Sequence, residues 1–555
     1  MAKPMDTPTR TKEPKENSKP HWSRNAVVYQ IYPISFKDSN EDGKGDLAGI
    51  LEKLDYLNGA QNSQNSLGIN AVWLCPFYPS PMLDFGYDVE NFVGVDPIFG
   101  NLEIFERLVS ELHKRNIKII IDFVGNHTSD KHAWFAESRG TRDNPKRDWY
   151  IWRDGDPHGG PPNNWVSVFS GSAWELDRTT NQYYFHSFLK EQPDLNWRNP
   201  EVCEAMAEVI DFWVGKGVDG FRIDAFLHFI EDKLMRDDPI NPLYNKNNDD
   251  SYNTLVHTHS IGNPDRMNIV AGFFKKTLGR HPDIVIVSEA YVSPKDIHRL
   301  QNIIGCDRFT VFNFNFINRK WDALEYKKII DEYLLNPPKD FLPNFVFGNH
   351  DVSRLASRVG EAEARVTAFL QFTLPGMLFV YYGDELGMTN AKIPHDAIKD
   401  FIAKIFVGLH DGRDPERTPM QWDDSPHAGF SAQKPWLPVN DNYKTMNVAR
   451  EERDPNSMWS LYKNLINLRQ KTEAFRLGEY IPLNSSSPSV FSFEIRYGSE
   501  RYFMAANFGD SIERELLPSN SRDPVMIFST AAKLSTKTLP LSIELMPFEG
   551  YAVKI

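Results

Sequence analysis

From about residue 26 onward, the chain alternates short apolar runs with longer amphipathic segments. Apolar runs of this length, bounded by polar turn residues, are typical of buried strands. Helical patterns lie between most of them, for example at 102–115, 201–214 and 361–373. Strands that alternate with helices predict parallel β/α units, and eight such units close a (β/α)8 TIM barrel of the α/β class. The predicted strands are 26–33, 69–76, 117–124, 218–225, 284–290, 309–316, 344–351 and 377–385.

Polar residues gather at the carboxyl ends of these predicted strands. In a (β/α)8 barrel the chemistry lies at that end, where the loops begin. A single histidine there is more often a satisfied core residue, but a series of acids and histidines at one end of successive strands predicts a site. The residues concerned are Asp122, Asn126, His127, Arg222, Asp224, Glu289, Asn349, His350, Asp351, Asp384 and Glu385.

The strand predicted at 218–225 carries the strongest chemical signal. Residues two apart in a strand point to the same side, so Arg222 and Asp224 project together. An arginine beside an aspartate keeps the carboxylate ionised and oriented, which suits a nucleophile. The alternative for this pair alone is a structural ion pair at the barrel rim.

Changes in the pattern divide the chain into parts. Residues 1–21 are rich in Pro, Lys, Thr and Glu and predict a disordered tail. Residues 22–127 and 198–476 predict the barrel, and the irregular stretch 128–197 predicts an inserted subdomain after the third strand. Short β-like runs in 477–555 predict a C-terminal antiparallel β-sandwich domain.

Composition narrows the possible partners. A net charge of −13 argues against nucleic acid and against an anionic membrane surface, because both need a basic face. No apolar run approaches the ~20 residues that span a bilayer, and the N-terminal stretch lacks the apolar core of a signal peptide. Three cysteines without metal-like spacing fit reduced thiols. We therefore expect a cytoplasmic protein, monomer or homodimer, that acts on small molecules.

Taken together, the motifs resemble those of the α-amylase superfamily, glycoside hydrolase family 13. The resemblance rests on DFVGNH at 122–127, GFRIDA at 220–225, SEA at 288–290 and FGNHD at 347–351. QPDLNW at 192–197 resembles the branch that contains exo-acting α-glucosidases and oligo-1,6-glucosidases. The resemblance extends from about residue 22 to the C-terminus.

The resemblance implies a retaining mechanism with three acids. Asp224 is expected to be the nucleophile, Glu289 the general acid/base and Asp351 a carboxylate that grips sugar hydroxyls in the transition state. The expected hydrogen-bond donors to the same sugar are His127 and His350, while Arg222 holds Asp224 ionised.

The resemblance further implies a closed pocket for one terminal glucose. Asp84 is expected to pair with Arg417 and cap the non-reducing end, and Tyr87 to stack on the sugar ring. The alternative for the Asp84–Arg417 pair is a salt bridge that tethers loops. Ala225 follows the nucleophile, where relatives that favour α-1,6 bonds carry valine, so α-1,4 substrates such as maltose are expected.

Residues 38–46 place oxygen ligands at alternate positions around a glycine turn. Asp38, Asn40, Asp42 and Asp46 suit a hard cation. By resemblance to this branch, Lys44 adds its backbone carbonyl and the loop binds a structural Ca²⁺ or Mg²⁺ without a catalytic role. The alternative is an Asx-rich turn with no ion.

Two other functions fit the same residues. A transglucosylase or sucrose isomerase passes the same intermediate to a sugar or alcohol, and Phe226 with the run at 312–316 then lines an apolar acceptor site or else packs in the barrel. A non-catalytic relative, such as a transporter heavy chain or a carbohydrate-binding protein, has no need for three retained carboxylates.

Overall fold

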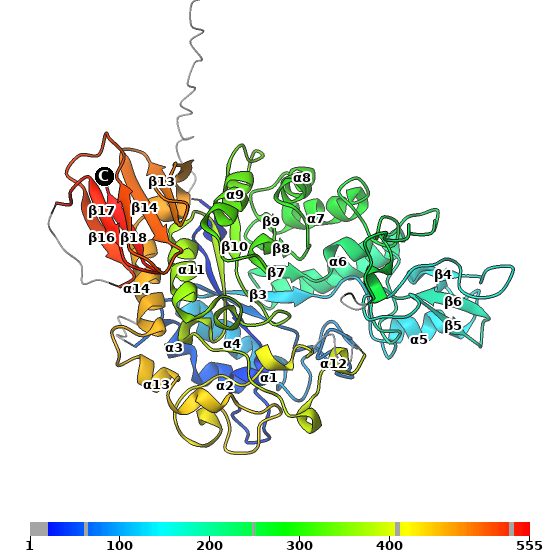
Figure 1. Ribbon diagram of the computed structural model, residues 1–555. Coiled ribbons are helices and arrows are strands. Elements are labelled where there is room, and N and C mark those ends of the chain that lie inside the picture. The colour runs from blue at the N-terminus through cyan, green and yellow to red at the C-terminus, as the bar shows by residue number, and fades with distance from the viewer. Residues whose placement is uncertain (1–19, 60–64, 247–248, 250, 406–410, 532–537) are drawn as a thin grey trace, which may run out of the picture.

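The computed structural model describes residues 20–59, 65–246, 249, 251–405, 411–531 and 538–555. Its centre is one sheet of eight parallel strands, ordered β10-β11-β1-β2-β3-β7-β8-β9. This confirms the predicted (β/α)8 barrel (Figure 1). The strands are β1 Val27–Ile31, β2 Ala71–Leu74, β3 Lys118–Phe123, β7 Gly220–Ile223, β8 Val285–Ser288, β9 Phe309–Val311, β10 Asn344–Val346 and β11 Met377–Tyr381.

Each strand is shorter than the apolar run that predicted it. The strand residues are almost all buried, which is why they carry mostly apolar sequence with few polar residues and no regular alternation. The polar residues after each strand lie in the loops. The fold therefore delivers these loops, and the acids on them, to one end of the barrel.

Side chains complete the barrel between its two outermost strands, β9 and β10. The buried Asn344 donates from Nδ2 to the carbonyl of Val311 at 2.7 Å and to Thr310 Oγ1 at 2.8 Å. Its Oδ1 accepts the backbone N–H of Asn313 at 3.0 Å. The side-chain amide of Asn344 thus replaces the backbone hydrogen bonds that would otherwise join β9 to β10, a junction called the seam below.

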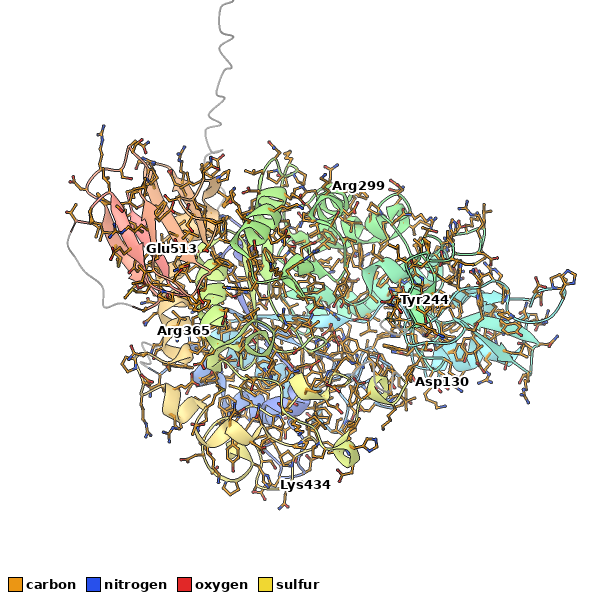
Figure 2. All side chains as sticks on the ribbon, in the orientation of Figure 1. Asp130, Tyr244, Arg299, Arg365, Lys434 and Glu513 are labelled. Atoms are coloured by element: carbon orange, nitrogen blue, oxygen red, sulfur yellow. The ribbon has the colours of Figure 1, made fainter. Side chains whose placement is uncertain are left out.

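Helices cover the outside of the barrel (Figure 1). In α4, Asn101 caps the N-terminus and a buried stripe of Phe105, Leu108, Val109 and Leu112 faces inward, as the 3.6-residue period requires. Charged residues such as Arg299 and Lys434 project outward (Figure 2). The longer helices are α4 Leu102–Lys114, α6 Pro200–Gly215, α7 Asn268–Arg280, α8 Pro294–Ile304, α9 Ala323–Leu334, α11 Glu361–Thr373 and α14 Met458–Lys471. The shorter ones are α1 Pro33–Phe36, α2 Leu47–Glu52, α3 Leu54–Asn58, α5 Ala133–Gly140, α10 Leu355–Val359, α12 Phe401–Ile405, α13 Val448–Glu451 and α15 Ala474–Leu477.

A small three-stranded sheet lies between β3 and α6 in the sequence, within the stretch predicted to be an inserted subdomain. Its strands are β4 Trp152–Arg153, β5 Trp174–Asp177 and β6 Gln182–Phe185, in the order β4-β6-β5. The sheet has an apolar cluster of its own and projects beyond the end of the barrel (Figure 1). The cluster consists of Ile151, Trp165, Ala173, Trp174 and Phe185.

The C-terminal part forms two antiparallel sheets, in agreement with the predicted sandwich. The five-stranded sheet packs one face on the barrel core, and residues of its other face join the smaller sheet in a second apolar cluster. Two hydrogen bonds tie this part to the barrel: Trp321 Nε1 donates to the carbonyl of Phe508 at 2.9 Å, and Tyr480 Oη donates to Asp331 Oδ1 at 2.7 Å. The strands are β12 Glu479–Pro482, β13 Val490–Tyr497, β14 Glu500–Asn507, β15 Glu513–Leu516, β16 Val525–Ser529, β17 Ser542–Leu545 and β18 Gly550–Lys554.

Most of the N-terminal tail predicted to be disordered, residues 1–19, lies outside the described residues. At the start of the described chain, Trp22–Asn25 forms a 3-10 turn, and Trp22 Nε1 donates to the carbonyl of Asp283 at 2.9 Å. Within the described residues, no helix has the length and apolarity needed to cross a membrane.

Replacement of the seam amide should weaken the whole barrel. Asn344→Ala removes the acceptor of the buried N–H of Asn313 and the hydrogen bonds to Val311 and Thr310. A buried group left unsatisfied costs about 1–3 kcal/mol, so we expect a clear fall in the midpoint of urea unfolding. The exposed Asn302→Ala on α8 is the matched control and should unfold like the wild type. Equal midpoints for the two variants would show that Asn344 does not hold the seam.

Candidate active site

The site is built around Arg222, at the carboxyl end of β7. Its side chain is only 1% exposed, and its Nη1 donates to Asp224 Oδ1 at 2.6 Å and to Asp122 Oδ1 at 2.7 Å. Asp122 on β3 is the register partner of Arg222, which explains why the two side chains meet. Nη2 of the same guanidinium lies 2.7 Å from Glu289 Oε2, in the loop after β8. One buried cation therefore holds three carboxylates from three neighbouring strands.

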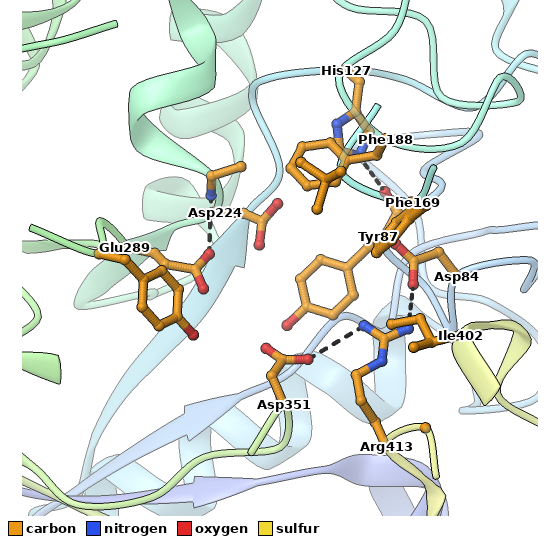
Figure 3. Close-up of a pocket in the computed structure, with 14 residues that line it drawn as sticks. Asp84, Tyr87, His127, Phe169, Phe188, Asp224, Glu289, Asp351, Ile402 and Arg413 are labelled. Carbon is orange, nitrogen blue, oxygen red and sulfur yellow. Dashed lines mark hydrogen bonds and ion pairs between the residues drawn. The ribbon is translucent and has the colours of Figure 1, made fainter. Parts of the chain in front are cut away.

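The backbone next to Asp224 also contacts Glu289. The N–H of Ala225 donates to Glu289 Oε2 at 3.1 Å (Figure 3). Ala225 has a left-handed conformation, with φ of 46° and ψ of 41°. This turn directs the N–H of Ala225 toward the carboxyl group that is expected to work with Asp224.

Burial separates the protonation states of the two expected catalytic acids. It raises the pKa of Glu289 to about 8, because the charge of Arg222 only partly offsets desolvation and the repulsion by Asp224 and Asp351. Burial also raises the pKa of Asp224, to about 6, although Arg222 opposes the shift. Near pH 7, Glu289 holds its proton and Asp224 is ionised, which is the pairing that an acid and a nucleophile need.

Asp351 lies in the loop after β10 and stays ionised. Burial pushes its pKa upward, but His350, Arg417 and Arg413 outweigh burial and hold the pKa of Asp351 well below its usual range. Arg417 Nη2 lies 2.8 Å from Asp351 Oδ1, and Arg413 Nη1 lies 3.3 Å from the same oxygen. A carboxylate that keeps its charge at all ordinary pH values suits the gripping of hydroxyl groups.

The partner expected for Asp84 is wrong. Asp84 Oδ1 accepts from Nη2 of Arg413 at 3.0 Å, and not from Arg417 (Figure 3). Arg417 is fully buried and donates to Asp351 and to the carbonyl of His350. Both arginines come from the same loop, four residues apart, and the path of that loop turns Arg413 toward the pocket and Arg417 behind it.

Tyr87 and the two histidines surround the same space. Tyr87 and His127 line the pocket, whereas His350 lies behind Tyr87 and is fully buried. Tyr87 Oη and His350 Nε2 are 2.7 Å apart, and Gln30 donates to the other ring nitrogen of His350. Burial lowers the pKa of His127 to about 4, so this ring is neutral and has one N–H. His350 therefore orients Tyr87, while His127 lines the cavity with its Nε2 3.1 Å from the carbonyl of Tyr87.

These groups enclose a cavity of about 340 Å³ (Figure 3). Its inner wall is polar, and several apolar side chains line the remainder. Asp224, Glu289 and Asp351 all face into it (Figure 3). The lining residues are Asp84, Tyr87, His127, Val168, Phe169, Phe188, Asp224, Ala225, Glu289, Tyr291, Asp351, Ile402, Gly412 and Arg413.

Three residues gain roles that the sequence did not assign: Asp122 was predicted only as a member of the strand-end series, and Gln192 and Arg413 were not predicted as site residues. Asp122 binds Arg222 and also accepts from Trp73 Nε1 at 2.8 Å. Gln192 is fully buried and donates to Asp84 Oδ2 at 3.1 Å. Arg413 caps the pocket. The sequence contained a signal for the first two, since they stand in the motifs at 122–127 and 192–197, but the choice between two arginines of one loop had none.

The loop at 38–46 is tied together by Asx turns. Asp38 accepts the backbone N–H of Gly43, Asn40 that of Asp42, and Asp46 caps α2 through the N–H of Gly49. Within the described part of the chain, no group of three or more His, Cys, Asp or Glu side chains is placed to hold a metal ion. The donor set is nevertheless all oxygen, which is the chemistry that Ca²⁺ and Mg²⁺ prefer.

Comparisons with known proteins show the family of this chain. The model of the α-amylase catalytic domain matches residues 30–478. The chain is 42% identical to an α-glucosidase of Apis mellifera, over 80% of this chain and 78% of that protein. It is 38% identical to an oligo-1,6-glucosidase of Heyndrickxia coagulans, over 88% and 92%. The chain therefore belongs to the α-amylase family, glycoside hydrolase family 13, and is a glycoside hydrolase whose relatives are α-glucosidases and oligo-1,6-glucosidases.

Among solved structures, the fold of this chain is also similar to that of enzymes that transfer or rearrange glucosyl groups. An α-glucosyl transfer enzyme has a TM-score of 0.88 at 33% identity, over 97% of this chain and all of that one. The trehalulose synthase of Pseudomonas mesoacidophila MX-45 has a TM-score of 0.86 at 34% identity, with the same coverage. An amino acid transporter heavy chain of Homo sapiens is also 39% identical, over 88% of this chain and 71% of that protein.

The two pKa values predict a bell-shaped dependence of kcat/KM on pH. Activity should fall below pH 6, as Asp224 gains a proton, and above pH 8, as Glu289 loses its own. With an aryl α-glucoside whose departure is assisted by protonation but does not depend on it, Glu289→Gln should remove the alkaline limb of the rate of glucosyl-enzyme formation. The exposed Glu137→Gln is the control and should keep both limbs. An alkaline limb that persists in Glu289→Gln would exclude Glu289 as the acid.

Proposed function

We propose that this protein is a retaining, exo-acting α-glucosidase that releases glucose from the non-reducing end of maltose and short α-glucosides. The observation that carries the proposal is the position of Asp224 and Glu289, held by the two nitrogens of one guanidinium at 2.6 and 2.7 Å. Retaining glycosidases need two carboxyl groups close together, ~5–5.5 Å apart, with one protonated and one ionised.

The reaction proceeds in two steps. The carboxylate of Asp224 attacks C1 of the sugar while Glu289 gives its proton to the glycosidic oxygen, so that the C1–O bond breaks and a β-glucosyl ester forms. Glu289, now ionised, takes a proton from water, and the water oxygen displaces Asp224 from C1. Asp351 stabilises the oxocarbenium-like transition states because its hydroxyl contacts tighten there.

The closed end of the pocket supports exo action. Asp84 and Arg413 form an ion pair across the cavity wall, and Gln192 holds the second oxygen of Asp84. A terminal glucose fits with its hydroxyl groups against this pair, and a longer chain has no path through it. The enzyme is therefore expected to remove one glucose at a time.

The linkage preference rests on Ala225, which lines the pocket beside the nucleophile. By resemblance to the family, a small residue here favours α-1,4 bonds, as the sequence predicts. Ala225 also stands at a left-handed backbone position, where a β-branched side chain is strained. The proposed order of preference is maltose before isomaltose.

Glucosyl transfer is the second candidate, and apolar residues at the pocket support it. Val168, Phe169, Phe188 and Ile402 line the cavity together with the polar groups, and a wall of this kind favours an organic acceptor over water. Two of the compared structures are of a glucosyl transfer enzyme and a trehalulose synthase. The residues first considered for the acceptor site pack elsewhere: Phe226 and the phenylalanines at 312–316 belong to the barrel core.

A non-catalytic role, like that of the transporter heavy chain, has less support. Asp224, Glu289 and Asp351 line one cavity, and their pKa values differ in the manner that catalysis requires. Simple sugar binding does not need a carboxyl group that stays protonated near neutral pH.

Parallel incubations with maltose, isomaltose, sucrose and trehalose test the proposal. Glucose release should be fastest from maltose, and chromatography should reveal new glycosides in smaller amounts. Asp224→Ala and Glu289→Gln should each lower kcat by at least about a thousandfold, since each removes a reacting group, while circular dichroism stays unchanged. Isomerised sucrose as the main product would favour the transfer function, and unchanged rates in Asp224→Ala would exclude the mechanism.

We also propose that the loop at 38–46 binds a structural Ca²⁺ or Mg²⁺ through Asp38, Asn40, Asp42, Asp46 and the backbone carbonyl of Lys44. The all-oxygen donor set supports this, as does the exposure of Asn40 and Asp42, which leaves their side chains accessible to an ion. The ion is expected to stabilise the loop after β1 and to take no part in the chemistry.

Binding of the ion should raise the thermal midpoint, because a ligand of the native state stabilises it. Wild-type protein stripped with EDTA should melt a few degrees lower than protein in millimolar Ca²⁺. Asp42→Ala should abolish this difference and leave maltose hydrolysis close to the wild-type rate. Identical melting of the wild type with EDTA, Ca²⁺ and Mg²⁺ would show that the loop is a simple turn.

A further inference from the structure

A buried aspartate stands behind the capped end of the pocket. Asp400 is fully buried and does not line the cavity. Its Oδ2 accepts from the backbone N–H of Arg413 at 2.6 Å and from Nε of the same residue at 3.0 Å. Its Oδ1 accepts from Nη2 of Arg413 at 3.1 Å. Asp400 thus binds Arg413 through both its backbone and its side chain.

The other hydrogen bonds of that guanidinium reach the pocket. Nη2 of Arg413 contacts Asp84 at 3.0 Å, and Nη1 contacts Asp351 at 3.3 Å. The rings of Phe169 and Phe401 lie 5.9 and 5.5 Å from the guanidinium carbon. The aromatic rings confine the group, and the hydrogen bonds set its rotation.

Asp400 itself is held in place by its surroundings. The carboxylate of Asp414 accepts the backbone N–H groups of Lys399 and Asp400 at 2.6 and 3.0 Å. Gly412 has a φ of 73°, and a Cβ added to it would lie only 3.2 Å from Cβ of Asp400. The segments at 399–400 and 412–414 therefore form one tight unit with Arg413 at its pocket side.

We infer that Asp400 is a positioning residue that orients Arg413 so that its guanidinium joins Asp84 to Asp351. Without the carboxylate of Asp400, the guanidinium is shared only between two acids that the sugar also needs, and it can turn toward either one. The inference rests on the proposed function, because the capped pocket matters through the glucose that it holds.

Asp400→Asn tests the role with almost no change in shape. Among the described residues, the Asp400 carboxylate accepts from four donors, which are three groups of Arg413 and the N–H of Ile402. Whichever way the asparagine amide is oriented, its NH2 group therefore faces groups that are themselves donors, and the hydrogen bonds on that side are lost. Loss of charged hydrogen bonds of about 1.5–3 kcal/mol corresponds to a fall of roughly 10- to 100-fold in kcat/KM for maltose. We expect most of it in KM, with partial recovery in Asp400→Glu. The exposed Asp396→Asn, in the same loop, should behave like the wild type.

A double variant separates positioning from general damage. If Asp400 acts through Arg413, Asp400→Asn should cost less than about twofold in kcat/KM when Arg413 is already alanine. If Asp400→Asn lowers kcat/KM as much in the Arg413→Ala background as it does in the wild type, the inference is overturned. It is also overturned if Asp400→Asn alone has a normal melting temperature and an unchanged KM. If Asp400→Asn lowers the melting temperature strongly, Asp400→Glu replaces it in the same comparison with and without Arg413→Ala, and the same two outcomes support or overturn the inference.

Binding of deoxynojirimycin, a glucose-like inhibitor, distinguishes this inference from the proposed function. A wild type that binds deoxynojirimycin in calorimetry but releases no glucose from any α-glucoside would refute the proposed function only. The weaker binding expected in Asp400→Asn, and its absence in the Arg413→Ala background, would still support the positioning role. Equal binding by the wild type and Asp400→Asn would refute the positioning role alone.

Discussion

The contact between Arg222 and three carboxylates is the interaction on which the site depends. A buried guanidinium needs counter-charges, and Asp122, Asp224 and Glu289 provide more than it can neutralise. The excess negative charge, together with burial, keeps one proton at the site near neutral pH. That proton belongs on Glu289, the acid with the higher pKa. The barrel supplies the geometry because adjacent parallel strands end side by side.

A second arginine centre shapes the far end of the pocket. Arg413 connects Asp84 with Asp351, and Asp400 anchors Arg413 from behind. Arg417 adds to the charge that keeps Asp351 ionised but lies outside the cavity. The two arginines have different electrostatic roles. Arg222 and its carboxylates set the protonation of the reacting groups, whereas Arg413 and its carboxylates hold permanent charges where sugar hydroxyls are proposed to bind.

The rest of the molecule makes these centres rigid. Buried aliphatic strands form the barrel wall, Asn344 bridges the seam between β9 and β10, and the hydrogen bonds of Trp321 and Tyr480 tie the C-terminal part to the barrel. The segment between β3 and α6 contributes Phe169 and Gln192 to the pocket side of the site. The packed barrel and the hydrogen bonds between its parts therefore hold groups that are distant in the sequence within hydrogen-bond distance of one another.

The sequence by itself determined the eight strands and the acids at their ends. Strands that are buried on both faces need apolar residues along their whole length, and polar residues follow where each strand ends. It also determined the pairing of Arg222 with Asp224, since the two-residue period of a strand is a local property. Only the tertiary structure decided that Arg413, and not Arg417, meets Asp84, and that Phe226 packs in the core. Long loops carry no period that fixes where their side chains point, so contacts across the pocket follow from the packing of the whole fold.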